Sequence, residues 1–374
     1  MKKKLITLAV ASTLTAAVAV SAPAFADTSN VTVYGFANLS YDLTNNGVVG
    51  VNKVSSSQSR LGLKGSEDLG DGLSAVWQIE QGINMDNAGA AGNGLGTRNT
   101  FLGLSSGSAG TFILGRHDTP YKIATRGLDL FADTIADNRG LMGTTAGGAT
   151  NAYAGAHDTR LGDVVAYISP AMNGFTGAIA YVAGAEATAT AAQVKGDAWS
   201  MAGLYGDGPV NVSLAYQVVN IGTVGTMSPT TFPVALAAND KLKAWKLGGG
   251  YTMDAFTVNA AYEKTSNTIA ALAPNGGDQT NWYLGGKYSF GNDAVKVAYT
   301  RAGDMQATPN SGAKQWALGY DHNMSKRTTL YALYTRLDNS TGSSYGLTSV
   351  STGATVGVAN QDPSAWSFGM KHTF

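Results

Sequence analysis

The most restrictive feature of the chain is a period-two alternation of apolar and polar residues, which recurs in about sixteen separate runs. VTVYGFANLSYD, from Val31, and VNVSLAYQV, from Val210, both show it. Each such run predicts a strand with one apolar and one polar face. TTLYALYTR alternates poorly, so its facing stays open. The runs begin near Val31, Ser59, Leu73, Arg98, Thr111, Gly162, Phe175, Ala198, Val210, Lys241, Thr257, Thr280, Ala294, Lys314, Thr328 and Ala365.

The links between these runs alternate in length. Short links such as EDLGDG and GDGP have turn-type sequences. The long links, rich in Gly, Ala, Thr, Asn and Ser, are approximately 44–57, 82–97, 118–159, 183–196, 219–240, 264–279, 302–313 and 338–364. Beyond the N-terminal segment, no stretch has the roughly 18 uninterrupted apolar residues of a membrane helix. The pattern predicts an all-β fold, a 16-stranded antiparallel transmembrane β-barrel with short periplasmic turns and long extracellular loops.

The first 26 residues have the pattern of an export signal. A basic start, MKKK, precedes the apolar LITLAVASTLTAAVAV and an A-x-A site at Ala24 and Ala26. The alternative, a membrane anchor, is disfavoured because the apolar run is short and contains Ser12 and Thr13. We expect cleavage after Ala26, which makes residues 1–26 the signal peptide and residues 27–374 the barrel.

Composition excludes several classes of function. The chain has no cysteine, so disulfides and thiolate metal sites are not available. Removal of the signal takes three lysines and no acid, and the absence of a basic excess argues against a nucleic-acid partner. The four histidines, His117, His157, His322 and His372, lack the spacing of metal ligands. We therefore expect neither a metal nor a cofactor.

One motif raises the possibility of an enzyme. GLSSG, from Gly103, matches the G-x-S-x-G pattern of hydrolases. That motif requires a turn from a strand into a helix. Here it ends a predicted strand and enters a tight turn, so we interpret it as a chance match and expect no enzymatic activity.

The longest link, 118–159, differs from the others because apolar residues and acids interleave in it. Within LDLFADTIADNRG, Asp129, Asp133 and Asp137 recur four residues apart, as on one face of a helix. A surface loop does not need this apolar content. We expect the segment to fold into the barrel lumen and narrow it; the alternative is a short amphipathic helix on the outer surface.

Strand parity places charged residues on the wall opposite this segment. In SRLGLKGS, Leu61 and Leu63 take the apolar face, so Arg60 and Lys64 point inward, and Glu80 of WQIEQG does the same. Inward placement is expected because a charge on the lipid face costs roughly 2–4 kcal/mol at mid-depth. Basic wall residues facing loop acids would create a transverse field, and arrays of charge are a means by which pores select ions.

The same logic applied to TRNTFLGLSS predicts Arg98 inward and Phe101 and Gly103 outward. Arg116 and Arg160 flank the 118–159 segment. The alternative is that these charges are solvated and have no role at a constriction. The residues predicted to line the constriction are Arg60, Lys64, Glu80, Arg98, Arg116, Asp129, Asp133, Asp137 and Arg160.

The chain ends on an alternating strand, WSFGMKHTF, rather than a polar tail. Trp366, Phe368 and Phe374 share its aromatic face, which is predicted to meet lipid or another subunit. A barrel in lipid cannot leave open edges. The last strand is therefore predicted to pair with the first and close the barrel.

The sequence resembles the trimeric general porins of Gram-negative proteobacteria over essentially the whole predicted mature chain. The segments that carry the resemblance, in order, are VTVYGFANLSYD, SRLGLKGSEDLGDGLSAVWQIEQGIN, NTFLGLSSGSAGTFILGRHDTPY, YISPAMNGFTGAIAY, LGYDHNMSKRTTLYALYTRL and WSFGMKHTF. The resemblance implies a sixteen-stranded barrel, three barrels per homotrimer, and an inward third loop. It also implies an arginine ladder at Arg60 and Arg98 and loop acids at Asp129 and Asp133, although the loop lacks the enterobacterial Pro-Glu-Phe-Gly motif.

The resemblance further implies a location in the outer membrane, among lipid and lipopolysaccharide, and a terminal Phe374 that the barrel assembly machinery reads as a sorting signal. Function is then expected to be passive diffusion of small hydrophilic solutes and ions through a water-filled channel. The alternatives are a substrate-specific channel, for example for anions such as phosphate, and a purely structural or adhesin barrel.

Overall fold

The computed structural model describes residues 30–86, 95–143, 157–184, 196–222, 240–267, 277–306, 308–347 and 360–374. The predicted signal peptide lies outside the described residues. The helices are α1 (Pro120–Arg126) and the short η3 (Asn138–Gly140). The strands are β1 (Thr32–Asn45), β2 (Gly50–Ser56), β3 (Arg60–Gly70), β4 (Leu73–Gly82), β5 (Thr100–Ser106), β6 (Gly110–Asp118), β7 (Arg160–Ile168), β8 (Phe175–Val182), β9 (Asp197–Asp207), β10 (Val210–Asn220), β11 (Lys241–Met253), β12 (Phe256–Asn267), β13 (Gln279–Phe290), β14 (Asp293–Ala302), β15 (Ala313–Asn323), β16 (Thr328–Asn339) and β17 (Ser364–Thr373).

The strands form one closed antiparallel barrel. From β3 to β17 each strand pairs with its neighbours in sequence, and β17 returns to β1. The closing register runs from Phe36 opposite Thr373 to Asn45 opposite Ser364. At the C-terminal end of β17, Phe374 N donates to Gly35 O and Gly35 N donates to Phe374 O. The predicted sixteen-stranded barrel, closed by its last strand, is confirmed.

One strand was not predicted. The expected link 44–57 contains β2, which pairs with Leu39–Asn45 of β1, while β3 pairs with Thr32–Phe36 of the same strand. β2 and β3 therefore follow one edge of β1, with a break at 57–59, where Gln58 has a φ of 58°. β2 adds an extra strand to the sixteen-stranded barrel rather than a seventeenth full-length one.

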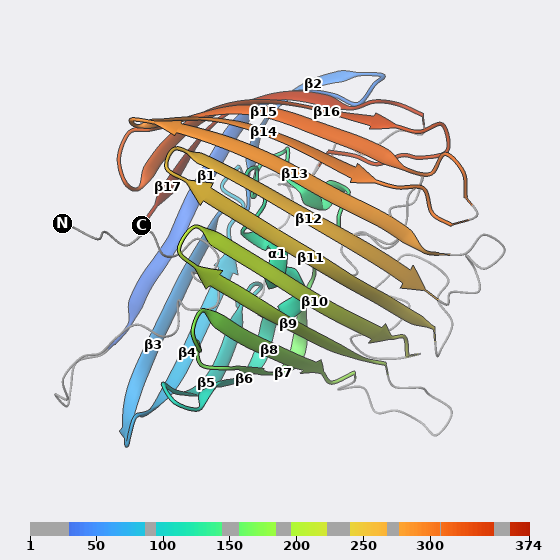
Figure 1. Cartoon of the computed structure of the whole chain (residues 1–374). Helices are drawn as coiled ribbons and strands as arrows, with labels where there is room; N and C mark the ends of the chain where they lie inside the picture. Colours follow the sequence, from blue (N-terminus) through green and yellow to red (C-terminus); the bar gives the residue numbers. More distant parts are fainter. Residues whose placement is uncertain are drawn as a thin grey trace.

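Links of unequal length connect the strands at the two ends of the barrel. Two-residue turns such as 71–72 and 208–209 lie at one end, and the links 83–99, 119–159 and 340–363 lie at the other. Figure 1 shows the hairpin turns at the end of the barrel where the C-terminus lies, and the strand ends that the long links join at the opposite end. The predicted asymmetry is confirmed. Among the described residues, no helix has the length and hydropathy needed to cross a membrane.

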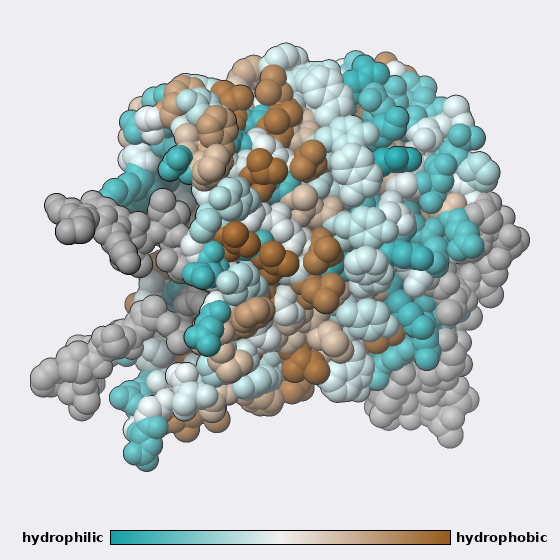
Figure 2. Space-filling view, in the orientation of Figure 1, coloured by the Kyte–Doolittle hydropathy of each residue, from teal (hydrophilic) through white to brown (hydrophobic). Residues whose placement is uncertain are grey.

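Along the strands, exposed apolar residues alternate with buried residues that are small or polar. In β10, Leu214 is 56% exposed whereas its neighbours Ser213 and Ala215 are 3% and 2% exposed. Figure 2 shows brown apolar side chains in a band across the outer wall, between teal hydrophilic ends. The outer wall thus has the apolar belt that contact with lipid requires.

Aromatic rings flank this belt. On the long-loop side, neighbouring strands pair rings such as Trp245 with Tyr262 and Trp366 with Tyr334, at centroid distances of 5.2 Å and 4.9 Å. On the short-turn side, Phe256 and Tyr288 lie 4.7 Å apart. Trp and Tyr are enriched at both membrane–water interfaces. Trp77, in the middle of β4, is outside these girdles.

The link between β6 and β7 enters the barrel, and we call it the inward loop (residues 119–159, described at 119–143 and 157–159). Figure 1 shows α1 inside the barrel, enclosed by the strands. Leu128, Phe131 and Ile135 join Leu333 and Leu337 of β16 in one buried cluster. The predicted inward fold is confirmed. The predicted helical face of Asp129, Asp133 and Asp137 is wrong, because α1 ends at Arg126 and turns follow it.

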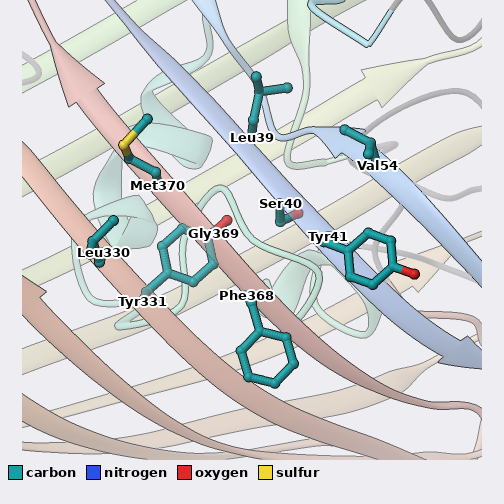
Figure 3. A pocket seen from close by; sticks show the side chains of 9 residues that line it. All are labelled: Leu39, Ser40, Tyr41, Val54, Leu330, Tyr331, Phe368, Gly369 and Met370. Carbon is teal, nitrogen blue, oxygen red and sulfur yellow. The ribbon is translucent and has the colours of Figure 1, made fainter.

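A shallow groove of about 520 Å³ hollows the outer wall at the closing seam. Figure 3 shows it around the small residues Ser40 and Gly369, bordered by Tyr41, Phe368 and Met370. The bordering side chains belong to the exposed face of β1 and β17. The groove is therefore part of the outer apolar surface and not of the lumen.

Candidate functional site

A cavity of about 290 Å³ remains between α1 and the barrel wall formed by β1 and β3–β7. Its charged side chains are Arg60, Lys64, Glu80, Arg98, Asp118, Lys122 and Arg126. Five of these are basic and two are acidic. The lining of the cavity therefore has an excess of three positive charges.

Four of the predicted constriction residues line this cavity. Arg60 and Lys64 come from β3, Glu80 from β4 and Arg98 from the bend before β5. Arg98 Nε donates to Glu80 Oε1 at 2.5 Å, and Arg98 Nη1 donates to Gln58 Oε1 at 3.1 Å. These bonds hold the guanidinium against the wall and lessen the freedom of a long side chain.

Tyr34 adds a second layer to this wall. Its hydroxyl donates to Glu80 Oε2 at 3.0 Å, and the Lys64 ammonium lies 5.2 Å from the centre of its ring. Cations are attracted to the face of an aromatic ring. Strand parity is the reason these groups meet, because Tyr34, Lys64 and Glu80 all face away from the exposed positions of their strands.

A direct ion pair joins the wall to the inward loop. Arg60 Nη2 lies 2.9 Å from Asp133 Oδ2, and the Arg60 guanidinium stacks 4.2 Å from the centre of the Phe36 ring. Burial raises the pKa of Asp133, but the positive charges of Arg126 and Arg60 outweigh it and hold the pKa at about 2. The Asp133 carboxylate is therefore charged at neutral pH.

Arg126, at the end of α1, forms ion pairs with the three loop acids. Its Nη2 lies 2.8 Å from Asp133 Oδ1 and 2.7 Å from Asp137 Oδ2, and its Nη1 lies 3.8 Å from Asp129 Oδ2. Arg139 also pairs with Asp137, at 3.0 Å. None of the three acids lines the cavity. The loop acids therefore pair mainly with arginines of the loop itself, and Asp133 pairs with Arg60 of the wall as well.

Asp129, like Asp137, has a buried carboxylate. Its oxygens accept from the backbone N–H groups of Phe131 and Asn138, at 2.9 Å and 3.0 Å. Burial, together with the nearby Asp137 carboxylate, raises the pKa of Asp129 to about 7. Asp129 therefore stabilises the turn of the loop and does not face the cavity.

The face that α1 presents to the cavity is basic. Thr119 caps the helix by accepting from Lys122 N, and Pro120 begins it. Lys122 Nζ lies 2.9 Å from Asp118 Oδ1. Burial lowers the pKa of Lys122 to about 8, although the Asp118 carboxylate opposes the effect. Positive charge is consequently present on both sides of the cavity. The expected approach of a basic wall to a loop acid occurs at Arg60 and Asp133, and Asp133 is not itself part of the cavity lining.

The two arginines that flank the loop lie apart from the Arg60–Asp133 contact. Arg160 Nη2 lies 3.0 Å from Asp118 Oδ1, and its Nε donates to Asn99 Oδ1 at 2.6 Å. Arg116 Nε donates to the backbone oxygen of Thr97 and does not line the cavity. Arg160 therefore supports the cavity edge, whereas Arg116 braces the end of β6.

The predicted facing of β5 is wrong. Phe101 lines the cavity, and Leu102 and Leu104 are the exposed residues, at 64% and 46%. The residues between Arg98 and β5 bend before the strand begins at Thr100, so parity counted from Arg98 does not carry into β5. Gly103 shares the inward face with Phe101, where a Cβ would meet Ile113.

The far side of the inward loop is fastened to the wall by buried polar groups. Tyr121 Oη and Gly143 N both donate to the Glu263 carboxylate, each at 2.8 Å. Asp158 forms an ion pair with Lys246, whose ammonium lies 4.1 Å from the centre of the Tyr121 ring. These contacts hold α1 against β9–β12, which keeps the cavity open on the side of the basic wall.

Sequence reasoning missed Arg126, Lys122 and Arg139. Arg126 and Arg139 bracket the three acids in the sequence, and this was an available signal because buried acids need partners. Within the described ranges, no three His, Asp or Glu side chains gather in a way that would hold a metal ion.

Comparisons with known proteins relate the chain to porins. The sequence model of a family described as Gram-negative porin matches residues 13–342. The chain is 30% identical over 384 residues, and 100% of both chains, to outer membrane porin protein 32 of Delftia acidovorans. It is 27% identical to the major outer membrane protein P.IB of Neisseria gonorrhoeae, over 88% of this chain and 91% of the relative.

Solved structures of outer membrane proteins share the fold of this chain. The anion-selective porin from Comamonas acidovorans superposes with a TM-score of 0.76 and 26% identity, covering 93% of this chain and 100% of the other. The trimer form of OmpT, an outer membrane protein of Vibrio cholerae, superposes with a TM-score of 0.66 at 16% identity, covering 93% of this chain and 100% of that one. The second likeness bears on the fold alone.

Proposed function

The chain belongs to the Gram-negative porin family, and from this premise we propose that it forms a water-filled channel for passive diffusion of small hydrophilic solutes and ions, with a preference for anions. Membership places the protein in the outer membrane and makes it a channel rather than an enzyme. The route that we propose runs through the cavity between α1 and the wall.

The observation that carries the proposal is the charge of this cavity. Arg60, Lys64 and Arg98 on one side and Lys122 and Arg126 on the other outnumber Glu80 and Asp118. A solute that passes between them meets a net positive lining, and arrays of Arg or Lys favour anions in pores. The anion selectivity stated for the Comamonas acidovorans porin is consistent with this proposal.

The constriction that we propose consists of this lining together with Asp133, which neutralises part of Arg60. Asp129 and Asp137 hold the loop in place, and Arg160 supports Asp118. We further propose a homotrimer, in line with the trimer form of OmpT, export with cleavage after Ala26, and reading of the terminal Phe374 by the barrel assembly machinery. No cofactor or energy source is needed for diffusion.

Reconstitution of the purified protein in planar lipid bilayers tests the proposal. We expect stable, ohmic conductance steps, and in a potassium chloride gradient a reversal potential of the sign that anions set. Arg60→Ser and Arg98→Ser should each move the reversal potential towards zero, because each removes a positive charge from the lining.

Lys314→Ser is the matched control, since it removes a positive charge from an exposed position on the outer wall. It should leave the reversal potential unchanged. Absence of conductance steps would contradict the channel. Steps whose selectivity neither arginine variant alters would contradict the placement of the constriction.

A further inference from the structure

The lining of the cavity changes character along the wall. Over β1, β3 and β4 it is basic and polar, with Arg60, Lys64 and Glu80. Over β5–β7 it gains the apolar side chains of Phe101, Ile113 and Ile168, and α1 adds Ile123. Thr111, His117 and Asp118 are the polar residues of the lining on these strands. A water-filled lumen is ordinarily lined by polar side chains. Diffusion of inorganic ions alone does not account for this apolar area.

Packing of the inward loop explains only part of the apolar area. Ile123 packs with Leu204 and Ile168, and Ile113 is 2% exposed in the buried cluster of β6–β11. Phe101 and Ile168 are only partly buried, and both line the cavity. The Phe101 ring meets the His117 imidazole edge-on, at a centroid distance of 5.4 Å and an interplanar angle of 65°.

The apolar area begins beside a cationic group. Phe101 follows Arg98 by three residues, and both line the same cavity. A guanidinium carries five N–H donors. Among the described residues, Arg98 engages Glu80 through Nε and Gln58 through Nη1, and these bonds do not use the two N–H groups of Nη2. The cavity thus combines a donor for an anion with an aromatic face next to it.

We propose that this cavity is a transient binding site for organic anions with an apolar body, of which aromatic carboxylates are the simplest class. The carboxylate accepts hydrogen bonds from Arg98 and is attracted by Arg60 and Lys122, and the ring packs on Phe101 and Ile168. The proposal rests on the proposed function, because it assigns a preferred solute class to the same channel.

The physical chemistry limits how tightly such a solute binds. Charge-assisted bonds to a guanidinium orient the carboxylate, and offset or edge-on packing with Phe101 adds a modest gain beyond the area buried. Conduction requires a site that is favourable enough to enter and weak enough to leave. The expected behaviour is therefore brief occupancy, during which chloride current is reduced.

The test compares two carboxylates of the same charge and similar size in planar bilayers: benzoate, with an aromatic body, and threonate, with a hydroxylated one. Each is titrated against chloride current through the unaltered protein. We expect benzoate to reduce the current at a concentration roughly three- to ten-fold lower than threonate does, the range that an aromatic contact supplies. Equal half-blocking concentrations would overturn the proposal, and this comparison needs no variant.

Two substitutions locate the site. Phe101→Ala should remove most of the difference between benzoate and threonate, whereas Leu102→Ala, on the exposed face of the same strand, should keep it. Arg98→Gln should weaken both carboxylates. A difference that survives Phe101→Ala would overturn the assignment to this cavity.

The two proposals fail in different ways. If the unaltered protein gives no chloride conductance, the proposed function fails. If it conducts chloride but does not distinguish the two carboxylates, the channel stands and the site for apolar anions is refuted.

Discussion

Arg126 shows how one residue decides which charges the passage displays. By pairing with Asp129, Asp133 and Asp137, it withdraws the acids of the inward loop from the lining. Of the wall arginines, Arg60 keeps one contact with Asp133, and Arg98 pairs with Glu80 on its own wall. A single side chain at the end of a seven-residue helix thereby gives both sides of the cavity the same sign.

The positive charge of the cavity lining depends on pH because Lys122 is part of the lining. Its pKa lies at about 8 because burial disfavours the ammonium, while Asp118 opposes the shift and Arg160 adds to it. Its proton is therefore bound at pH 6.5 and mostly lost at pH 9.5, and the lining loses one positive charge between the two. We expect the reversal potential in a chloride gradient to move towards zero over this interval.

The control for this pH dependence is Lys122→Gln, in which the group that titrates is absent. This variant should start at pH 6.5 with a weaker anion preference and change less up to pH 9.5 than the unaltered protein does, because Asp129, whose pKa of about 7 also lies in this range, does not line the cavity. A pH dependence of equal size in the variant and the unaltered protein would assign the effect to another group.

Counting alternate residues along the predicted strands identified some lumen residues and misplaced others, in each case for a local reason. Arg60, Lys64 and Glu80 lie within strands, where inward and outward positions alternate without interruption. Phe101 was assigned to the wrong face because bends at 98 and 99 separate it from the residue used for the count. The arginines that pair with the loop acids were missed because turns bring them together, and turns leave no periodic pattern in the sequence.

At the scale of elements, the inward loop stays in the lumen through apolar packing on the wall. Phe131 is fully buried, and its ring lies against Gly319 of β15, where a Cβ would approach ring carbon Cε1 to 2.7 Å. Leu333 and Leu337 of β16 face the same cluster. Leu333 lies within TTLYALYTR, which alternates poorly because the loop covers an apolar residue on its lumen face.

Phe131→Ala should loosen this attachment. Removing a buried phenylalanine side chain costs about 3–5 kcal/mol, which would raise the undocked population of the loop by roughly two to four orders of magnitude. We expect larger fluctuations of the open-channel current and faster cleavage of the loop by an added protease. Phe112→Ala, at an exposed position on the outer wall, should change neither, and equal effects of both would contradict the attachment.

The two unpredicted features of the elements share a cause. In β2, Val51 and Val54 lie three apart, fall on opposite faces and are both exposed, at 53% and 54%. This strand pairs along β1 without an apolar side to bury, so it carries no period-two signal. The turns that follow α1 likewise owe their shape to ion pairs rather than to a repeat.

At the scale of the whole molecule, the number of strands, their order and the two kinds of ends follow from requirements that every strand shares. Lipid demands an apolar outer position at alternate residues and a closed set of backbone hydrogen bonds. The sequence of each strand therefore reflects these requirements, including that of the last strand, WSFGMKHTF. Only the filling of the lumen depends on contacts between distant segments, such as Tyr121 with Glu263.

The central claim is that ions pass between α1 and the arginine-bearing wall, and cysteine labelling tests it directly. The chain has no cysteine of its own, so a single introduced thiol reports on one position. Lys64→Cys places it in the cavity lining, and Leu63→Cys places it one residue away, on the exposed outer face. The measurement is single-channel current before and after a negatively charged methanethiosulfonate reagent, with labelling verified by mass spectrometry. Modification of Lys64→Cys should reduce the conductance and the anion preference at once, and modification of Leu63→Cys should leave both unchanged. An unaltered current in fully labelled Lys64→Cys, or an equal loss in both variants, would contradict the proposed path.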